Sequence, residues 1–505
     1  MVNKKASGKK MAWGDLFDLR REDIRALYKT TAAFFLTFYV WFNMAPLVTT
    51  IVSVGGLTMA QLKLLAVCNV ALTVPARIFI GMASDHFGPR RTFSALMVIM
   101  AVPALVFAFS TGYTEMLVSR LIMSMVGAGF VIGIHMTSLW FKPRDIGFAE
   151  GVEAGLGNWG SSIAAMTIPA ATVVSSSLVG AEYGWRYGMA LSAAVMMLYG
   201  VYYWFGITDG PVGSTFRKPR RAAAIEVSTW GDLGNAIVWT VPIMGVLALL
   251  AWRVHGMGFM NETALMVCYG LVALGVLYQM VQLLRVNVPI LKRGVPEDDK
   301  YRFTEVAVLC AAYVVTFGAE LGVVSMLPAF YQKTFALDPV KAGLVGGSFA
   351  FLNFFSRALG GYISDRVPSR KGALVVYLAG TAATFGLMGL ITPAWPLPLA
   401  ILVTLLCALF VTGGCGTTFA LVPLVKRRVT GQVAGYAGAY GNVGATIFLT
   451  AYTFVSSQQF FFLIGAVALA SFLFAVLAFR EPAGAFAEEY HLSSVDRALE
   501  AGHAH

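Results

Sequence analysis

Long apolar runs separated by short polar loops are the dominant pattern along this chain. Each run has about 20 residues or more, the length with which a helix crosses a hydrocarbon core roughly 30 Å thick. The short alternating segments of a membrane β-barrel do not occur in the sequence. Because helices satisfy their own backbone hydrogen bonds in lipid, the pattern predicts an all-α membrane protein. We expect fourteen spans, at about residues 30–51, 58–84, 93–111, 115–140, 148–176, 185–207, 233–252, 264–285, 303–332, 339–364, 371–391, 397–424, 431–456 and 459–480.

Two sequence elements recur in the same order and divide the chain into halves. Residues 77–85 and 357–365 both run from Arg through Gly to Ser-Asp, and residues 157–160 and 441–444 both have the form Gly-Asn-x-Gly. This repetition predicts two homologous six-helix halves, with two further spans between them that match neither half and form an inserted hairpin. The expected organisation is an N-terminal segment at 1–29, a first half at 30–207, a linker with the hairpin at 208–302, a second half at 303–480 and a tail at 481–505.

Basic residues gather in the loops on one side of the expected membrane. These loops follow every second span, at residues 86–91, 142–144, 217–221, 292–293, 366–371 and 426–428. By the positive-inside rule, we expect a multi-pass protein of the cell inner membrane with both chain ends in the cytoplasm. The net charge of +11 is then a signal of topology, so we expect the lipid bilayer and no nucleic acid as a partner.

Composition excludes several other classes of protein. Hydrophobic residues make up 58% of the chain and charged residues 12%, which is too little charge to cover a soluble domain of 505 residues. The five cysteines lie inside apolar runs without paired spacing, which indicates core residues. The sequence contains no metal-spaced cluster, nucleophile elbow or phosphate loop, so we expect no enzyme, no metal and no cofactor.

The loop after the second span carries a signature sequence. Residues 81–91, Gly-Met-Ala-Ser-Asp-His-Phe-Gly-Pro-Arg-Arg, resemble the GxxxDxxGxRR loop of the major facilitator superfamily. Asp85 can pair with a cation or cap a neighbouring helix N-terminus, and Arg90 belongs to the same loop. Asp365 and Arg366 follow the same span of the second half, so we expect a cytoplasmic latch made of these four residues.

Two arginines are expected deep in the membrane. Arg77 and Arg357 each precede a latch aspartate by eight residues, which places them about 12 Å deeper, near the bilayer midplane. An arginine at that depth costs from about 2.5 to over 10 kcal/mol unless it faces a polar environment. One alternative is internal pairing of each arginine with a carboxylate. The other is a shared cavity in which two guanidinium forks bind a planar oxyanion.

The repeated Gly-Asn-x-Gly motifs bring two kinds of residue to the expected cavity wall. Close helix packing through small residues is expected at Gly157, Gly160, Gly441 and Gly444. The asparagines Asn158 and Asn442 each bring an amide to the same symmetric position. Because an amide can donate to an oxyanion at little charge cost, both are candidates for anion binding.

The paired arginines and paired glycine motifs together are similar to those of the nitrate/nitrite porter family, the NarK-like proteins, over both halves. The resemblance implies a transporter in which Arg77 and Arg357 bind the anion. It also implies that three aromatic residues clamp the flat anion between the arginines, namely Phe130, Tyr313 and Phe317. Without the resemblance, aromatic residues at these positions indicate core packing.

Two carboxylates inside the spans distinguish this chain from the simplest exchangers of that family. Glu320 follows the clamp aromatics by one turn, in a Gly-x-Glu-Leu segment similar to the proton-coupled branch of the family. Glu153 lies five residues before Asn158. Because a buried carboxylate can carry a proton, both are candidates for proton coupling. The alternative for Glu320 is that it neutralises an arginine.

The expected function is import of nitrate, and with it nitrite, by alternating access of the two halves and with proton symport. Nitrate/nitrite antiport is the main alternative. A transporter of small carboxylates such as formate would also use two arginines, whereas a drug antiporter favours acids in its cavity. A receptor would need a sizeable soluble sensory domain. The expected partners are the inorganic anion and the proton, and the expected oligomeric state is a monomer.

Overall fold

The structure is a computed structural model in which every regular element is a helix, within the residues it describes. These residues are 11–44, 47, 50–51, 56–58, 61, 65, 68–70, 72–211, 224–256, 258, 260–337, 339–452, 454–482, 484–487 and 492–502. The expected all-α class is therefore confirmed. The basic loop expected at 217–221 lies outside the described residues.

The first half has a helix in each of the six expected spans, with parts of the first two spans lying outside the described residues. The helices are α1 (Glu22–Phe42), α4 (Thr73–Phe87), α5 (Pro89–Phe109), α6 (Tyr113–Met123) with η3 (Ser124–Ala128) and α7 (Gly129–Trp140), α8 (Ile146–Val179) and α9 (Ala181–Gly206). A short helix, η1 (Trp13–Phe17), precedes them. The helix of the first span starts at Glu22, eight residues earlier than expected, because the apolar residues of its first turns, Ile24, Ala26 and Leu27, are buried within the protein.

The second half repeats this arrangement. Its helices are α12 (Phe303–Tyr313) with η5 (Val314–Gly318) and α13 (Ala319–Phe335), α14 (Pro339–Phe351) with α15 (Asn353–Arg366), α16 (Arg370–Gly389), α17 (Leu397–Val425), η6 (Arg427–Val429), α18 (Thr430–Tyr452) and α19 (Ser457–Ala478). Besides η6, two further elements of this region lie outside the expected spans, η4 (Glu297–Asp299) and α20 (Ser494–Gly502). Both belong to the polar end of the molecule.

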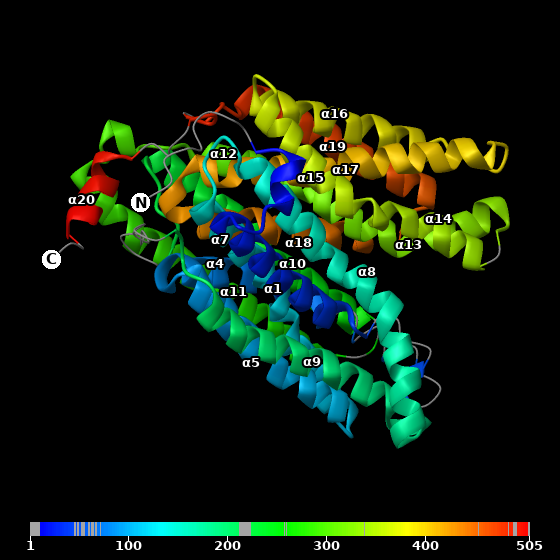
Figure 1. Ribbon diagram of the computed structural model, residues 1–505. Coiled ribbons are helices and arrows are strands. Elements are labelled where there is room, and N and C mark those ends of the chain that lie inside the picture. Colours follow the sequence, from blue (N-terminus) through cyan, green and yellow to red (C-terminus); the bar gives the residue numbers. More distant parts are fainter. Residues whose placement is uncertain are drawn as a thin grey trace.

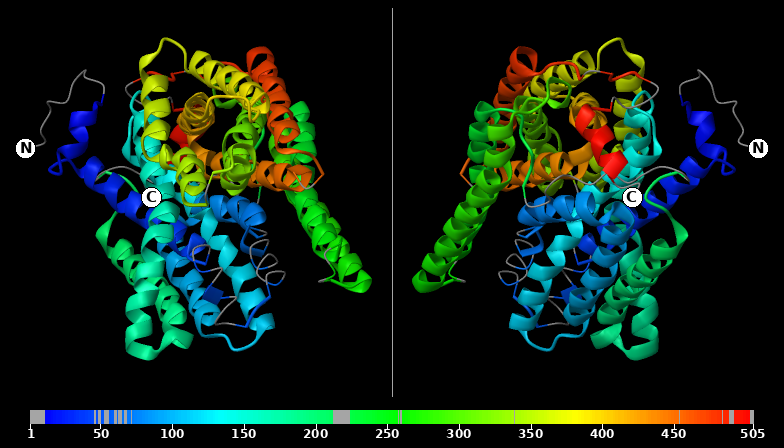
Figure 2. Two further views of the ribbon diagram at one scale, coloured as in Figure 1. Left: turned by 90° about the vertical axis from the view of Figure 1, so that its right-hand side faces the viewer. Right: turned by 90° about the vertical axis from the view of Figure 1, so that its left-hand side faces the viewer.

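The inserted hairpin is formed by α10 (Trp230–Gly256) and α11 (Glu262–Arg293). It packs on the second half, where the Tyr440 hydroxyl donates to the Trp239 carbonyl oxygen at 2.7 Å and the hydroxyls of Thr240 and Tyr436 lie 3.2 Å apart. Most of α11 is exposed on the outside of the bundle, and the hairpin projects at the periphery in Figure 2. The hairpin also contacts α4 of the first half, where Ile78 and Met82 lie beside Leu283 of α11. It is thus attached mainly to the second half, next to the boundary between the halves.

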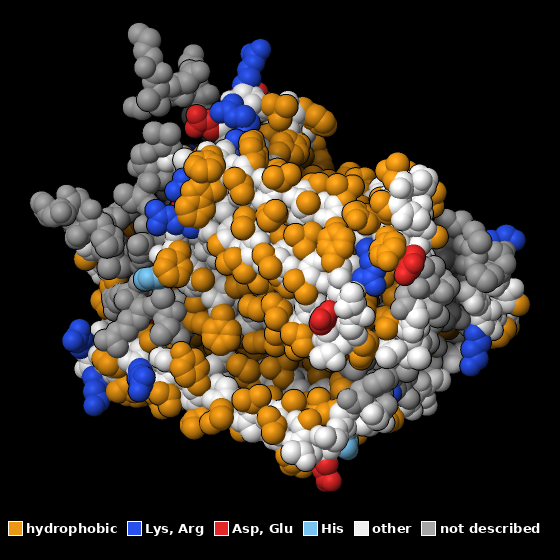
Figure 3. Space-filling view, turned by 90° about the horizontal axis from the view of Figure 1, so that it is seen from below, with side chains coloured by type: hydrophobic (Ala, Val, Ile, Leu, Met, Phe, Trp, Pro, Cys, Tyr) orange, Lys and Arg blue, Asp and Glu red, His pale blue; other side chains and the backbone are white. Residues whose placement is uncertain are grey.

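Nine helices in the described part of the chain are long and apolar enough to cross a membrane. The expected count of fourteen spans stays a prediction. Seen from one side, the surface is mainly hydrophobic across its broad middle, as Figure 3 shows. An apolar belt of this kind suits contact with lipid.

The two halves meet closely at the end where α20 lies and diverge toward the other end (Figure 1). At the closed end the contact is made by glycines. A Cβ on Gly81 of α4 would lie 2.2 Å from the carbonyl oxygen of Gly431, and one on Gly361 of α15 would lie 1.8 Å from that of Gly147. Because no side chain fits there, the backbones of α4 and α18, and of α8 and α15, touch directly.

A charge cluster joins α20 to the same end of the molecule. Arg428 donates to Asp496 of α20 at 2.6 Å, to Asp299 at 3.2 Å and to Glu226 of the linker at 3.0 Å. Lys426 also pairs with Asp299. The linker, the loop after the hairpin, the α17–α18 connection and the C-terminal segment are thereby held together.

Candidate functional site: two arginines around one aromatic ring

Arg77 lies in the second turn of α4 and is fully buried. Its Nε donates to the carbonyl oxygen of Gly127 at 3.3 Å, and its Nη1 donates to that of Gly438 in the second half. Its Nη2 has no hydrogen-bond partner, and no carboxylate forms an ion pair with it, among the residues described. The guanidinium group therefore keeps one donor for a ligand.

Arg357 occupies the corresponding place in α15 but has a different environment. Its Nη2 donates to Oε2 of Glu320 at 2.8 Å, and its Nε donates to Oδ1 of Asn353 at 2.7 Å. The Asn353 amide in turn donates to the other oxygen of Glu320. Internal pairing with a carboxylate, the alternative considered for both arginines, thus holds for Arg357.

Both guanidinium groups lie against the ring of Phe317. The Cζ atoms of Arg77 and Arg357 lie 5.3 Å and 5.4 Å from its centroid, within the range of cation–π attraction. Arg77 also lies 5.4 Å from the ring of Phe130. The two arginines from opposite halves therefore converge on one place, as the sequence predicts.

The three predicted clamp aromatics form a single parallel stack. The rings of Phe130 and Tyr313 are 6.0 Å apart at 5°, and those of Tyr313 and Phe317 are 5.1 Å apart at 6°. Irregular helical turns place them there. Tyr313 directly precedes the π-helical turn η5 and Phe317 lies within it, and Phe130 follows the 3₁₀ turn η3. Such turns re-aim side chains and are frequent at functional sites.

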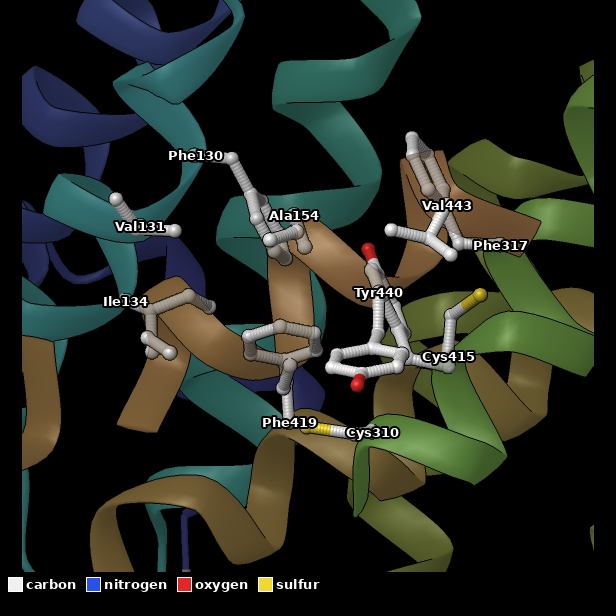
Figure 4. Close-up of a cluster of buried hydrophobic side chains, with 14 of the residues drawn as sticks. Phe130, Val131, Ile134, Ala154, Cys310, Phe317, Cys415, Phe419, Tyr440 and Val443 are labelled. Atoms are coloured by element: carbon white, nitrogen blue, oxygen red, sulfur yellow. The ribbon is translucent and has the colours of Figure 1, made fainter. Parts of the chain in front are cut away.

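A fourth aromatic residue, Phe419 of α17, completes the cluster. Its ring meets those of Phe130 and Tyr313 edge-on, with centroids 4.5 Å and 4.6 Å away. Figure 4 shows Phe130, Phe317 and Phe419 projecting into the same space from helices of both halves. Sequence reasoning missed Phe419, since a phenylalanine within an apolar span carries no distinguishing signal.

The two predicted asparagines donate to their own helices. The amide of Asn158 donates to the carbonyl oxygen of Ala154 at 2.7 Å, and that of Asn442 to Gly438 at 3.4 Å. Gly438 also accepts from Arg77, so Asn442 lies on the same turn as this arginine's partner. A direct contact of either amide with an anion stays a prediction.

The four predicted packing glycines lie at close helix contacts. Gly157 and Gly160 pack on α1, where a Cβ would lie 1.9 Å and 2.2 Å from the nearest atoms. Gly441 and Gly444 pack on α12 and η5, where a Cβ would lie 2.7 Å from its neighbours in both cases. The rings of Tyr313 and Phe317 are the groups that fill the space beside Gly441. This glycine is thereby what allows the aromatic stack to lie on α18.

The two predicted proton-coupling carboxylates differ in their surroundings. Glu320 is held by Arg357 and Asn353, as described above. Both oxygens of Glu153 are buried without a hydrogen-bond partner among the described residues, and the same is true of Glu150 one turn earlier. Sequence reasoning did not single out Glu150, although a second acid inside the same span was a signal available to it.

The latch aspartates cap helices of the opposite half. Asp85 accepts from two backbone N–H groups at the start of α18, both at 2.9 Å. Asp365 accepts from two at the start of α8, at 3.2 Å and 2.7 Å. A carboxylate at a helix N-terminus stabilises it by about 0.5–2 kcal/mol. The two caps are related by the repeat and hold the halves together at the α20 end.

The latch arginines lie elsewhere. The backbone N–H of Arg90 donates to Asp209 at 2.7 Å and its guanidinium lies 5.9 Å from the ring of Trp204, both in the first half. Arg366 donates to the carbonyl oxygen of Met11 at 3.2 Å. In neither case do these contacts include a latch aspartate. Of the two alternatives for Asp85, a cation partner or a helix cap, the structure shows the helix cap.

Arg370 is the cation that pairs with Asp365, and sequence reasoning missed it. The two side chains are 2.5 Å apart, and Nη2 of Arg370 donates to the carbonyl oxygen of Pro143 in the first half at 2.6 Å. The residue lies in a loop of several cations, and the sequence does not distinguish among them. Only the fold shows which one turns toward the interface.

Comparison with known proteins agrees with this geometry. The model of the Major Facilitator Superfamily matches residues 30–449. The chain is 41% identical over 504 residues to the nitrate/nitrite transporter NrtP of Picosynechococcus sp., with 92% of this chain and 94% of that protein covered. It is 25% identical over 489 residues to the probable nitrate/nitrite antiporter NarK1 of Thermus thermophilus, with 90% and 91% covered.

The fold has similar solved structures as well. The crystal structure of the human organic anion transporter MFSD10 has a TM-score of 0.60 and 14% identity, with 90% of this chain and 100% of that one covered. The chain belongs to the major facilitator superfamily and, within it, to the family of nitrate/nitrite transporters. Its relatives and its fold are those of membrane transporters and not of enzymes.

Proposed function

We propose that the protein carries nitrate and nitrite across a membrane, with Arg77 and Arg357 as the residues that bind the anion. The observation that carries this proposal is their convergence on the ring of Phe317, with a free donor on Arg77. A guanidinium fork suits a planar oxyanion because its N–H groups lie in one plane. The names of the relatives, nitrate/nitrite transporters, support the same cargo.

The charges at the site favour a monovalent anion. Arg77 and Arg357 bring two positive charges, and Glu320 brings one negative charge within 2.8 Å of Arg357. One nitrate or nitrite ion neutralises the remainder. A divalent anion such as sulfate would leave an unbalanced negative charge in a medium of low dielectric constant.

The aromatic stack supports recognition of a flat anion. The parallel rings of Phe130, Tyr313 and Phe317 present faces in one orientation, and an oxyanion bound between the arginines would lie along them. The aromatic side chains also exclude water, which strengthens the attraction between the guanidinium groups and the anion.

Transport would occur by alternating access of the two halves around this site. The close contacts at the α20 end and the divergence at the opposite end support a state open on the opposite side. We place the α20 end in the cytoplasm and the protein in the inner membrane, because the basic loops lie on that side. We further propose that the protein acts as a monomer, with one site between its two halves.

Net uptake needs a source of energy. A membrane potential that is negative inside opposes entry of an anion by about 2.3 kcal/mol per charge at 100 mV. Symport with protons would overcome this electrical barrier, since two protons entering with one nitrate carry a net positive charge into the cell. The buried carboxylates provide groups that could carry them.

The test is uptake of labelled nitrate by proteoliposomes, with nitrite, formate and sulfate as competitors. We expect nitrite to compete strongly, formate weakly and sulfate not at all. Arg357→Lys should lose most nitrate binding although the charge is kept, because a lysine has no planar fork. Arg120→Lys is the matched control, since Arg120 is also fully buried but donates to Trp41 and Asn43 within the first half. Equal loss in both variants, or formate binding as tightly as nitrate, would contradict the assignment.

Nitrate/nitrite exchange is the second candidate, favoured by the similarity to the probable antiporter NarK1. Vesicles loaded with nitrite and vesicles without it separate the two modes. Symport predicts nitrate accumulation in both when the outside is acidic, whereas exchange predicts it only with nitrite inside. In the same assay, Glu320→Gln tests whether that carboxylate takes part: an unchanged dependence on the proton gradient removes it from the coupling step.

A further inference from the structure

Two glutamates on α8 are buried charges that the anion site leaves unexplained. Glu150 and Glu153 have no exposed surface, and none of their carboxyl oxygens has a hydrogen-bond partner in the part of the chain that the structure describes. Three residues apart on one helix, they lie on the same face, about 4.5 Å apart along its axis. An ionised carboxylate in such surroundings costs several kcal/mol, whereas a protonated carboxyl group is neutral. The pair is therefore suited to hold a proton.

We propose that Glu150 and Glu153 together form the site that holds the co-transported proton, an inference that rests on the proposed proton-coupled uptake. Glu320 is less suited to this role, because Arg357 and Asn353 engage both of its oxygens. Glu320 then serves as the counter-ion of Arg357, and a different carboxylate carries the proton.

The position of the pair couples it to the anion site. Gly151, between the two glutamates, packs on α15 so closely that a Cβ there would lie 2.7 Å from the carbonyl oxygen of Arg357. On the other side, Oε1 of Glu153 would lie 2.0 Å from a Cβ on Gly133 of α7. The turn of α8 that carries the carboxyl groups therefore touches the turn of α15 that carries Arg357, across the boundary between the two halves. Any rocking of the halves changes both environments at once.

The charged and titratable groups that face the pair come from three neighbouring elements. Asp365 of α15 and Arg370 of α16 act on Glu150, Arg357 of α15 acts on Glu153, and Tyr203 of α9 faces Glu153. The two glutamates also act on each other. Since two adjacent carboxylates resist ionising together, at least one proton stays on the pair until its surroundings change.

Opening of the latch would change the surroundings of Glu150 and Glu153. Asp365 holds the first N–H groups of α8, and Glu150 follows the second of these, Phe148, by only two residues. When the halves separate at the α20 end, this cap breaks and water reaches Glu150. The O–H bond of the carboxyl group then breaks, the proton passes to water on that side, and a carboxylate remains. It is protonated again when the pair next faces the opposite side.

The experiment uses the full-length protein in proteoliposomes, with Glu150→Gln, Glu153→Gln and the double variant. Three readouts are taken: nitrate binding, exchange of internal nitrate for external labelled nitrate without gradients, and nitrate accumulation driven by an acidic exterior. We expect binding and exchange within about twofold of the wild type and accumulation at least tenfold lower in the double variant. Glu305→Gln is the control, because Glu305 is a buried glutamate that pairs with Arg302 at 3.6 Å.

The outcomes separate this inference from the proposed function. Accumulation that survives in the double variant overturns the proton site and leaves anion transport intact. Absence of nitrate binding by the wild type would instead overturn the proposed function itself. If the glutamine variants lose exchange as well, the same assays are repeated with Glu150→Asp and Glu153→Asp. Both aspartate variants keep a titratable group, so they test the proton site separately from the structural effect of glutamine. Acid-driven accumulation in the aspartate variants supports the proton site, and its absence overturns it.

Discussion

Arg77 and Arg357 occupy equivalent positions in the two halves, yet their surroundings differ in charge. Arg357 is paired with Glu320 and braced by Asn353, whereas Arg77 is bound by two backbone carbonyl groups and keeps a free N–H. The repeat thus supplies the symmetric frame, and one added carboxylate makes the site asymmetric. Under the proposed function, this difference gives the two arginines separate tasks: Arg77 would attract the anion, and Arg357 would be held in place to meet it.

The largest expected effect comes from changing the arginine that lacks a carboxylate. Arg77→Lys should weaken nitrate binding by about 10- to 150-fold, corresponding to about 1.5–3 kcal/mol for a hydrogen bond to a charged group. Arg357→Lys should lose less, about tenfold, because Glu320 already satisfies part of that charge. Isothermal titration with nitrate measures both. Equal losses would show that the asymmetry has no consequence for binding.

The difference in charge between the two arginine environments can also be removed by neutralising Glu320, the carboxylate beside Arg357. Glu320→Gln raises the net charge of the site by one, so nitrate should bind on the order of tenfold tighter and sulfate should begin to compete. Turnover should fall, because the anion leaves more slowly. Competition binding with labelled nitrate provides the measurement. Weaker nitrate binding would mean that Glu320 is needed to position Arg357 and would refute its role as a simple counter-ion.

The two latch aspartates offer a comparison in which the halves are expected to behave alike. Asp85→Asn and Asp365→Asn should each weaken the closed α20 end by about 0.5–2 kcal/mol, since each removes one charged helix cap. Asp209→Asn is the matched control, because Asp209 accepts from the N–H of Arg90 at the start of α5 within one half. Labelling of cysteines introduced at the α20 end reports the opening. Faster labelling in the control variant than in the latch variants would argue against the latch.

The smallest expected effect lies in the charge cluster at α20. Burial alone would raise the pKa of Asp496, but the charge and the hydrogen bond of Arg428 outweigh it and lower that pKa. A carboxylate with a lowered pKa stabilises the fold fully above its unfolded value of about 3.9 and loses that contribution as the pH falls through the folded value. We therefore expect α20 to stay docked from pH 8 to about pH 5 and to loosen below about pH 4.

Hydrogen exchange of α20 checks this prediction. Asp496→Asn should raise exchange in α20 at neutral pH by a few-fold, with Glu262→Gln on the exposed start of α11 as the control. Unchanged protection in Asp496→Asn would show that the ion pair with Arg428 contributes little to docking.

The fold could be predicted from the sequence because lipid constrains it so strongly. A run of about 20 apolar residues must form a helix in a bilayer, and the described residues within the expected ranges are largely helical. The repeat fixed the positions of Arg77 and Arg357, since their spacing from Asp85 and Asp365 sets their depth. The aspartate caps also followed from the chemistry of helix termini.

The details of partner choice could not be predicted in the same way. Glu320 of α13 pairs with Arg357 of α15 and not with Arg77 because of how these helices are placed in the fold. The spacing of these residues along the chain does not indicate which arginine is the partner. The selection of Arg370 as the partner of Asp365 is likewise a property of how one loop folds back on the helix ends. Chain periodicity sets which residues are buried, and tertiary packing sets which of them touch.

The central claim is that Arg77 offers a free donor to a monovalent anion at the ring of Phe317. A structure of the protein with bound nitrate tests this most directly. The account predicts a nitrate oxygen within about 2.7–3.2 Å of Nη2 of Arg77, beside the Phe317 ring and within reach of Arg357. Nitrate bound away from both arginines, or Arg77 paired with a carboxylate while nitrate is bound, would contradict it.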